Sequence, residues 1–176
     1  MVATSAYMIV FRILHIGAGV AWAGSVFMLV VLVQPSAAAI GPAASPFMME
    51  LLAKRKLVSW LLSLAGTTIV AGLFVYWKDW HDRASFGDFV SSGFGLALTI
   101  GAVAAIGAFL VGLLGTKPSA DRLIELATRA AASEGGPPPE VAQEIPRIQA
   151  RMKTLARISF ALIVVAVLAM STARYW

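Results

Sequence analysis

The chain has 176 residues, of which 59% are hydrophobic and 13% are charged. A soluble domain carries about 25% charged residues, and a chain of this length cannot enclose a core that would bury so much apolar surface. The composition therefore excludes an ordinary soluble domain and favours a protein that has lipid as its solvent. The sequence contains no Cys, which excludes disulfides, thiolate metal sites, cysteine nucleophiles and haem attachment through a Cys-x-x-Cys-His motif.

Four apolar runs are long enough to cross about 30 Å of hydrocarbon at about 1.5 Å per residue. They cover about residues 8–33, 57–77, 93–115 and 155–173, and Gln34 and Pro35 are expected to break the first helix. We expect a single all-α membrane domain over residues 1–176, folded as a transmembrane four-helix bundle. The first run is much longer than the 7–15 apolar residues of a signal peptide, so we interpret it as a span.

Basic residues are unevenly divided between the two sides of the predicted bundle. Ten lie in the connections after the first and third runs: Lys54, Arg55, Lys56, Lys117, Arg122, Arg129, Arg147, Arg151, Lys153 and Arg157. The other side carries Arg12, Lys78, Arg83 and Arg174. The positive-inside rule places the first set in the cytoplasm and both termini outside, in the inner (plasma) membrane. This sorting explains the net charge of +5 without a nucleic-acid partner.

Residues 116–154 are the part of the chain that resembles soluble protein, and we expect them to form a cytoplasmic amphipathic helical hairpin. Pro118 marks a helix start, and a first apolar face repeats at helical spacing: Leu123, Leu126, Ala127 and Ala130. A second amphipathic stretch, which from Pro146 can run without interruption into the fourth run, has one apolar face: Val141, Ile145, Ile148, Met152 and Leu155. Either the hairpin lies on anionic headgroups, with Arg122, Arg129, Arg147 and Arg151 as its polar edge, or it docks a partner protein.

The first run contains the most informative polar constellation. At about 100° per residue, one helical stripe carries Arg12, His15, Gly19, Trp22 and Val26. An imidazole in hydrocarbon needs a partner, so the stripe should face the bundle interior. It could hold a b-type haem, with His15 as axial ligand, Arg12 at a propionate, Gly19 leaving room and Trp22 lining the pocket. Alternatively, His15 only forms a hydrogen bond to another helix.

The second histidine, His81, lies in the connection after the second run. Together with Asp79 and Asp82, and with Asp88 nearby, it could bind copper or zinc at the outer surface. The alternative is a solvated interfacial loop. Elsewhere, small residues in the second and third runs, including Gly72 and Gly112, indicate close helix packing. No hydrolase, kinase or ion-pump pattern is present.

Leu14-His15 followed by Trp22-Ala23-Gly24 resembles the His…Trp-x-Gly pattern of CopD-like membrane proteins, which include the copper resistance D and HemJ-type families. Arg55 at the start of the second run, Gly72 late in it, and the ending Met170-Ser171-Thr172-Ala173-Arg174-Tyr175 extend the similarity. The resemblance implies a bundle in which His15 faces the core at a haem-ligand position. The chain lacks the second intramembrane His of HemJ-type proteins and the Met-rich or His-rich clusters of copper-handling proteins.

Three functional hypotheses follow from these patterns. The first is an accessory or scaffold subunit of a membrane complex or a homo-oligomer, with the lipid bilayer, other membrane subunits or further copies as partners. The second is a membrane redox or haem b-binding protein. The third is copper or zinc handling at the outer surface. The sequence favours a protein without catalytic activity.

Overall fold

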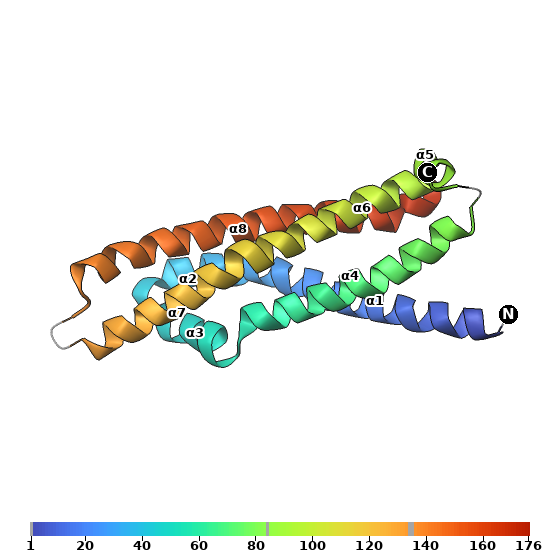
Figure 1. Cartoon of the computed structure of the whole chain (residues 1–176). Helices are drawn as coiled ribbons and strands as arrows, with labels where there is room; N and C mark the ends of the chain where they lie inside the picture. The colour runs from blue at the N-terminus through green and yellow to red at the C-terminus, as the bar shows by residue number, and fades with distance from the viewer. Residues whose placement is uncertain (1, 84, 134–135) are drawn as a thin grey trace.

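The computed structural model describes residues 2–83, 85–133 and 136–176, and these form helices joined by short connections (Figure 1). The elements in chain order are α1 (Val2–Met28), η1 (Leu29–Val33), α2 (Gln34–Ile40), η2 (Gly41–Ala44), α3 (Ser45–Met49), η3 (Glu50–Lys54), α4 (Leu57–His81), α5 (Phe86–Ser91), α6 (Gly93–Leu110), η4 (Val111–Thr116), α7 (Lys117–Ala132), α8 (Pro139–Thr172) and η5 (Ala173–Tyr175). Both termini lie at one end of the bundle, here called the terminus end. The connection between α7 and α8 lies at the other, the hairpin end.

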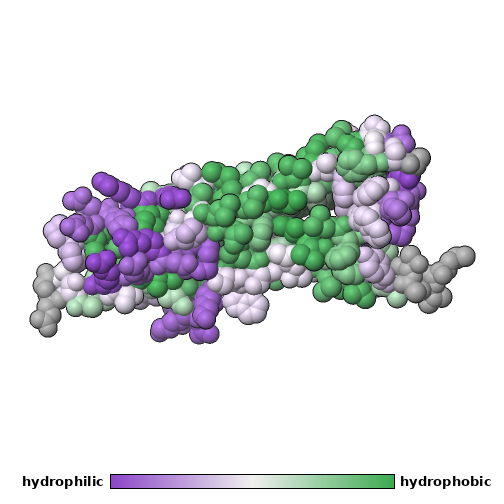
Figure 2. Space-filling view, viewed as in Figure 1, coloured by the Kyte–Doolittle hydropathy of each residue, from purple (hydrophilic) through white to green (hydrophobic). Residues whose placement is uncertain are grey.

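Four helical stretches in the described residues are long and apolar enough to cross a membrane, which confirms the all-α four-helix fold. The surface carries a wide apolar band in the middle and hydrophilic residues that gather mainly at the hairpin end (Figure 2). The last stretch is longer than a bilayer requires, because the 34 residues of α8 extend about 51 Å. A hydrocarbon layer of about 30 Å therefore leaves part of α8 outside the membrane.

The bundle is built from two closely packed helix pairs, α1 with α4 and α6 with α8. A buried cluster drawn from all four helices joins the pairs: Trp22, Val26, Ala65, Ala104, Ala105, Ala108, Ile163 and Ala166. Small side chains dominate the α6 share of this cluster, as the sequence predicts. A Cβ on Gly101 would lie 2.6 Å from Met170 Cγ, so glycine is what allows α6 to approach α8 this closely.

Prolines in the first and third spans widen the helix and do not end it. The expectation that Pro35 breaks the first helix is wrong, because the chain stays helical through η1 and α2. Proline lacks an N–H and its ring crowds the carbonyl four residues earlier, so a π-helical turn before it relieves the clash. Pro118 stands in the same position after η4, and α6, η4 and α7 form one helical stretch, Gly93–Ala132.

The helical path after the first span reverses at Gly41, whose φ of +71° is one that side chains rarely allow. Three short elements, η2, α3 and η3, then lead back to the start of α4. The sequence predicted no structure for this connection. At the terminus end, α5 is a further unpredicted helix, capped by Ser85, whose hydroxyl accepts a hydrogen bond from the Asp88 backbone N–H.

The predicted helical hairpin between the third and fourth spans is confirmed. Its apolar faces pack on one another and on the start of α4, in a cluster formed by Leu52, Val58, Ala120 and Leu123 together with Ile145, Ile148 and Met152. The sequence Glu134-Gly135-Gly136 predicts the end of the first hairpin helix, but residues 134 and 135 lie outside the described residues; the described part of this helix, α7, ends at Ala132. The apolar side chains of the hairpin that belong to this cluster are therefore used in packing within the protein.

Candidate functional site

His15 forms a direct link between α1 and the backbone of α4. Its Nδ1 lies 2.7 Å from the carbonyl oxygen of Thr68, so Nδ1 carries the proton and donates it. The carbonyl is accessible because Gly72, one turn later, has no side chain. A Cβ at Gly72 would lie 2.6 Å from Nδ1 and 2.7 Å from Cε1 of the imidazole. The sequence placed His15 on the interior stripe but could not name Thr68 or Gly72 as its partners.

The other three residues of the predicted haem set serve different local contacts. Gly19 lies against Thr68, whose Cγ2 would be 3.3 Å from a Cβ at that glycine, so the space beside His15 is filled by α4. Trp22 is buried, with 7% of its surface exposed, in the cluster shared by the four helices. Arg12 is 57% exposed and lies 3.8 Å from Asp79 of α4. Of the four, His15 is the residue whose ring nitrogen contacts the backbone of another helix, and α4 fills the space at Gly19.

The predicted metal set at the end of α4 is not brought together. Within the described residues, no group of three or more His, Asp or Glu side chains is close enough to hold a metal ion. Asp79 faces Arg12, Asp82 is bound by Lys78, and His81 stacks on Trp77. Adjacent positions on a helix point about 100° apart, so His81 projects away from both carboxylates. Metal binding by these residues stays a prediction, and their side chains are not arranged as a preformed metal site.

A cavity of about 130 Å³ lies between the two helix pairs. We call it the inner cavity. Its lining comes from all four spans and is mostly apolar, with Trp22 and Phe109 among its aromatic residues and Met48 and Met152 among its flexible ones. Three polar side chains, those of Gln34, Thr116 and Ser159, also line it.

All three π-helical segments in the described residues contribute to the lining of the inner cavity. Leu29 and Val30 come from η1, Leu52 from η3, and Gly112 and Thr116 from η4. Such segments are rare and are concentrated at functional sites. Sequence reasoning missed this cavity, although Pro35 and Pro118, which come shortly after two of the apolar runs, are the signal that could have indicated it.

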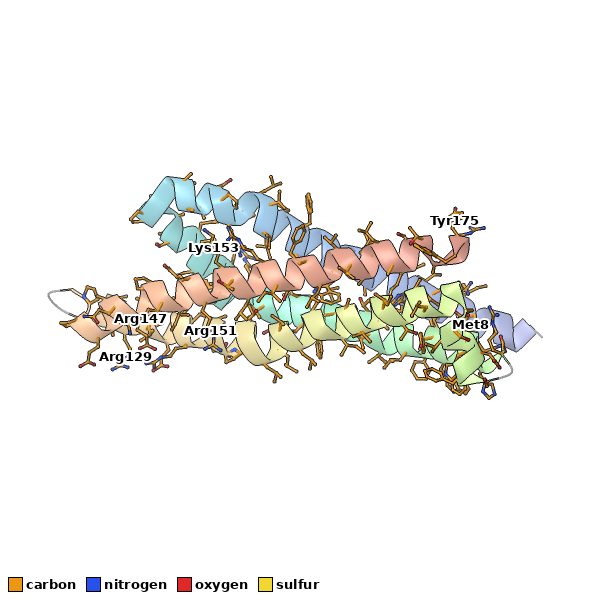
Figure 3. The ribbon with its side chains drawn as sticks, turned by 90° about the horizontal axis from the view of Figure 1, so that it is seen from above. Met8, Arg129, Arg147, Arg151, Lys153 and Tyr175 are labelled. Carbon is orange, nitrogen blue, oxygen red and sulfur yellow. The ribbon has the colours of Figure 1, made fainter. Side chains whose placement is uncertain are left out.

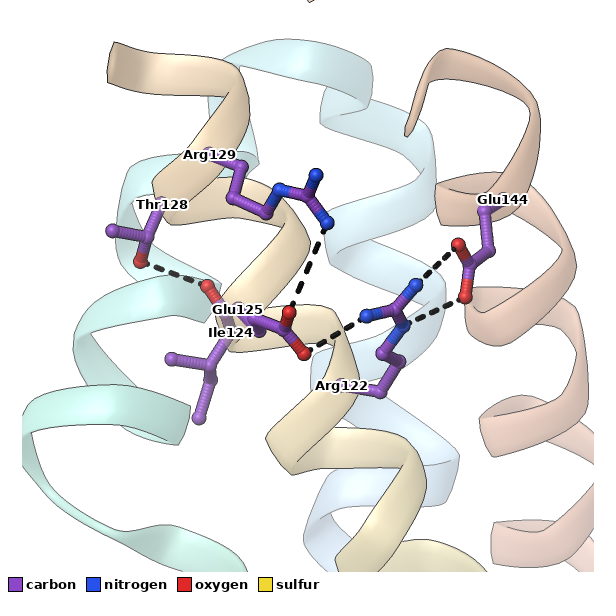
Figure 4. Close-up of polar contacts among 6 residues, drawn as sticks. All are labelled: Arg122, Ile124, Glu125, Thr128, Arg129 and Glu144. Carbon is purple, nitrogen blue, oxygen red and sulfur yellow. Dashed lines mark hydrogen bonds and ion pairs between the residues drawn. The ribbon is translucent and has the colours of Figure 1, made fainter. Parts of the chain in front are cut away.

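A charged network braces the hairpin beyond the apolar band (Figure 4). Arg122 on α7 donates two hydrogen bonds of 2.8 Å to Glu144 on α8, one from Nε and one from Nη2. Its third nitrogen binds Glu125 at 2.9 Å, and Glu125 lies 3.9 Å from Arg129. The hydrogen bonds from Arg122 hold the pKa of Glu144 below its ordinary value. Arg122 and Arg129 are therefore engaged within the hairpin.

The outward half of α8 carries four further basic side chains: Arg147, Arg151, Lys153 and Arg157. All four are exposed, and none forms an ion pair with a described residue. Figure 3 shows Arg147 and Arg151 on the side of α8 that faces Arg129 of α7, and Lys153 on the other side of α8; all three lie toward the hairpin end, far from Met8 and Tyr175. No Asp or Glu follows Glu144 in the sequence. We call this surface the basic face of α8.

Comparison of the chain with family models, with curated proteins and with solved structures gives no match.

Proposed function

We propose that this small integral membrane protein is a non-catalytic accessory or scaffold subunit that presents its hairpin to a partner protein with an acidic surface. The main support for this proposal is the basic face of α8, which lies on a rigid hairpin. The Arg122–Glu144 bridge and the shared apolar cluster fix α7 against α8. The four basic side chains remain available to another molecule. We further propose that the hairpin lies in the cytoplasm of a cell bounded by this membrane, with both termini outside.

The length of the basic face favours a protein over lipid headgroups as its partner. Arg157 directly precedes the apolar part of α8, so headgroups can reach it. Arg147 lies ten residues further from the membrane, which is about 15 Å along a helix. Since the basic face extends beyond headgroup level, its outer part needs a partner that projects from the membrane.

Site-specific photo-crosslinking in native membranes tests the proposal. A p-benzoylphenylalanine in place of Ala150, which is exposed between Arg147 and Arg151 and Lys153, should give one crosslinked product heavier than the 18.6 kDa chain. The double change Arg147→Glu and Arg151→Glu should lower the yield by about tenfold or more, because it sets like charges against an acidic surface.

The same crosslinker in place of Ala161 is the matched control. Ala161 is exposed on the same side of α8, three turns further along, within the apolar part of the helix. The yield of any crosslinked product from position 161 should be the same with and without the charge reversal. A chain that stays monomeric with the crosslinker at position 150, or a yield that the charge reversal leaves unchanged, would contradict a docking role.

A second candidate function, haem b binding at His15, is supported by one specific contact and by the resemblance of the first span to CopD-like and HemJ-like proteins. Histidines that ligate metals usually donate their other ring N–H to a carbonyl or carboxylate, and the Nδ1 of His15 does so to Thr68. This leaves Nε2 with its lone pair for an axial bond. The filled space at Gly19 counts against it, because α4 would have to move.

The absorption spectrum of the purified protein from haem-replete cells tests this second candidate. Haem at His15 gives a Soret band that His15→Ala abolishes, while Arg12→Gln, which alters an exposed side chain, leaves the band in place and shifts it at most. Circular dichroism of His15→Ala must show an intact helical fold. A colourless wild-type preparation would reject the haem candidate.

A further inference from the structure

We infer that the inner cavity is a binding site for a ring-sized apolar group of a molecule dissolved in the bilayer. This inference is independent of the proposed docking role, because the inner cavity and the basic face of α8 use different residues. It rests on the chemistry of the lining, on the size of the space and on the backbone that surrounds it.

The lining selects an apolar ligand. It combines the aromatic rings of Trp22 and Phe109 with aliphatic side chains from all four spans. Apolar surface of this kind favours an apolar ligand over water, because most of it offers no hydrogen-bond partner. Only Gln34, Thr116 and Ser159 offer polar atoms, which suits a ligand with at most one hydrogen-bonding group.

The size sets the scale of the ligand. A cavity of about 150 Å³ lined by apolar side chains binds benzene, and the inner cavity measures about 130 Å³. It is open on part of its boundary, so an apolar molecule has a route into it. A single ring therefore fits, and a larger ligand would place one ring here and leave the remainder outside.

Two further features distinguish a binding site from a packing defect. The cavity is bordered by η1, η3 and η4, and π-helical segments of this kind recur at functional sites. Met48 and Met152 face it from opposite parts of the chain. Methionine side chains are flexible and polarizable and are common on surfaces that adapt to different ligands.

Fluorescence quenching of Trp22 by iodobenzene tests the inference in lipid nanodiscs. A variant in which Trp60, Trp77, Trp80 and Trp176 are changed to Phe reports on Trp22 alone. The heavy iodine atom quenches an indole that it touches, and a finite site gives quenching that saturates. We expect saturable quenching of Trp22 and its loss in Ala108→Leu, since Ala108 is buried on the cavity wall and the longer side chain fills the space.

Two controls and a substitute filling variant make the result decisive. A chain that keeps only Trp60, which is 65% exposed, should show quenching that rises in proportion to iodobenzene in the lipid. Ala161→Leu, on the exposed side of α8, should leave saturable quenching of Trp22 unchanged. If Ala108→Leu does not fold, Ala156→Leu fills the same cavity from α8. Unsaturable quenching of Trp22, absent quenching, or quenching that survives the filling variant would overturn the inference.

Discussion

The contact between His15 and α4 shows how a polar residue can be accommodated in an apolar helix pair. The imidazole satisfies its Nδ1–H on the Thr68 carbonyl, and the missing side chain of Gly72 makes room for the ring. Thr68 itself is satisfied, since its hydroxyl donates to the Leu64 carbonyl at 2.8 Å. This polar contact therefore leaves no buried donor without a partner.

Gly72→Ala should destabilise the protein, because the new Cβ would overlap the His15 ring and push it off the Thr68 carbonyl. Overpacking of this kind costs about 1–3 kcal/mol. Gly66→Ala on the same helix is the control, since a Cβ there meets nothing within 4 Å. It should be neutral or stabilise the helix by up to about 1 kcal/mol. Unfolding in mixed micelles of increasing SDS content measures both changes.

A double-mutant cycle assigns the effect to the histidine. In a His15→Ala background the overlapping ring is gone, so Gly72→Ala should cost much less than it does in the natural chain. Equal losses in the two backgrounds, or equal losses at Gly66 and Gly72, would show that the ring does not occupy this space.

At this scale the sequence predicted the location of His15 better than its contacts. Helical periodicity was enough to place His15, Gly19, Trp22 and Val26 on the side of α1 that faces the bundle. It could not show that Gly19 would be filled by Thr68 or that Arg12 would face Asp79, because both depend on the register between α1 and α4. This register is set by the packing of the two helices against each other, and it cannot be predicted from the periodicity of one helix.

At the scale of the elements, the sequence analysis was wrong about the effect of a proline on a helix. Pro35 was expected to break a helix, yet the helix continues past it through a π-helical turn. Pro118 was expected to begin a helix, and α7 does begin beside it, at Lys117, although α7 follows directly on η4. A helix that is held by packing on both sides can widen more cheaply than it can end, because ending would expose backbone groups in the membrane. The same widening places backbone around the inner cavity.

The hairpin should loosen at acid pH. Arg122 lowers the pKa of Glu144, so the closed hairpin binds a proton less readily than an open one. This stabilisation is present above the ordinary carboxyl pKa of about 4 and is lost as the pH falls through the lowered pKa of Glu144. The effect is modest, since the side chains of Arg122 and Glu144 are 40% and 38% exposed and water screens their charges.

Distances between spin labels on Thr128→Cys and Ala142→Cys measure this opening, and the chain has no other Cys. We expect a narrow distribution at neutral pH and a broader one below about pH 4. Glu144→Gln should already be broader at neutral pH and should not respond to acid, while Glu140→Gln should behave like the natural sequence. If the distance distribution of Glu144→Gln still broadens in acid, the opening is caused by the protonation of another group.

For the whole molecule, composition and run length were sufficient to predict a four-helix membrane bundle and the hairpin between its third and fourth helices. They were not sufficient for the connections, where α2, α3 and α5 are helical, nor for the division of the bundle into the pairs α1–α4 and α6–α8. Hydrophobicity reports which segments prefer lipid, whereas pairing depends on where small residues such as Gly72 and Gly101 let two backbones approach.

The proposed docking role depends on how the molecule is oriented in the membrane. It requires the basic hairpin and the two termini to lie on opposite sides of the bilayer. Because the chain has no Cys, single Cys residues can be placed at Ser85, between α4 and α5, and at Thr128, on α7. In intact cells, a maleimide that does not cross membranes should label Ser85→Cys and should label Thr128→Cys only after permeabilisation. Labelling of both positions in intact cells, or of Thr128→Cys alone, would contradict a four-span topology with the hairpin in the cytoplasm.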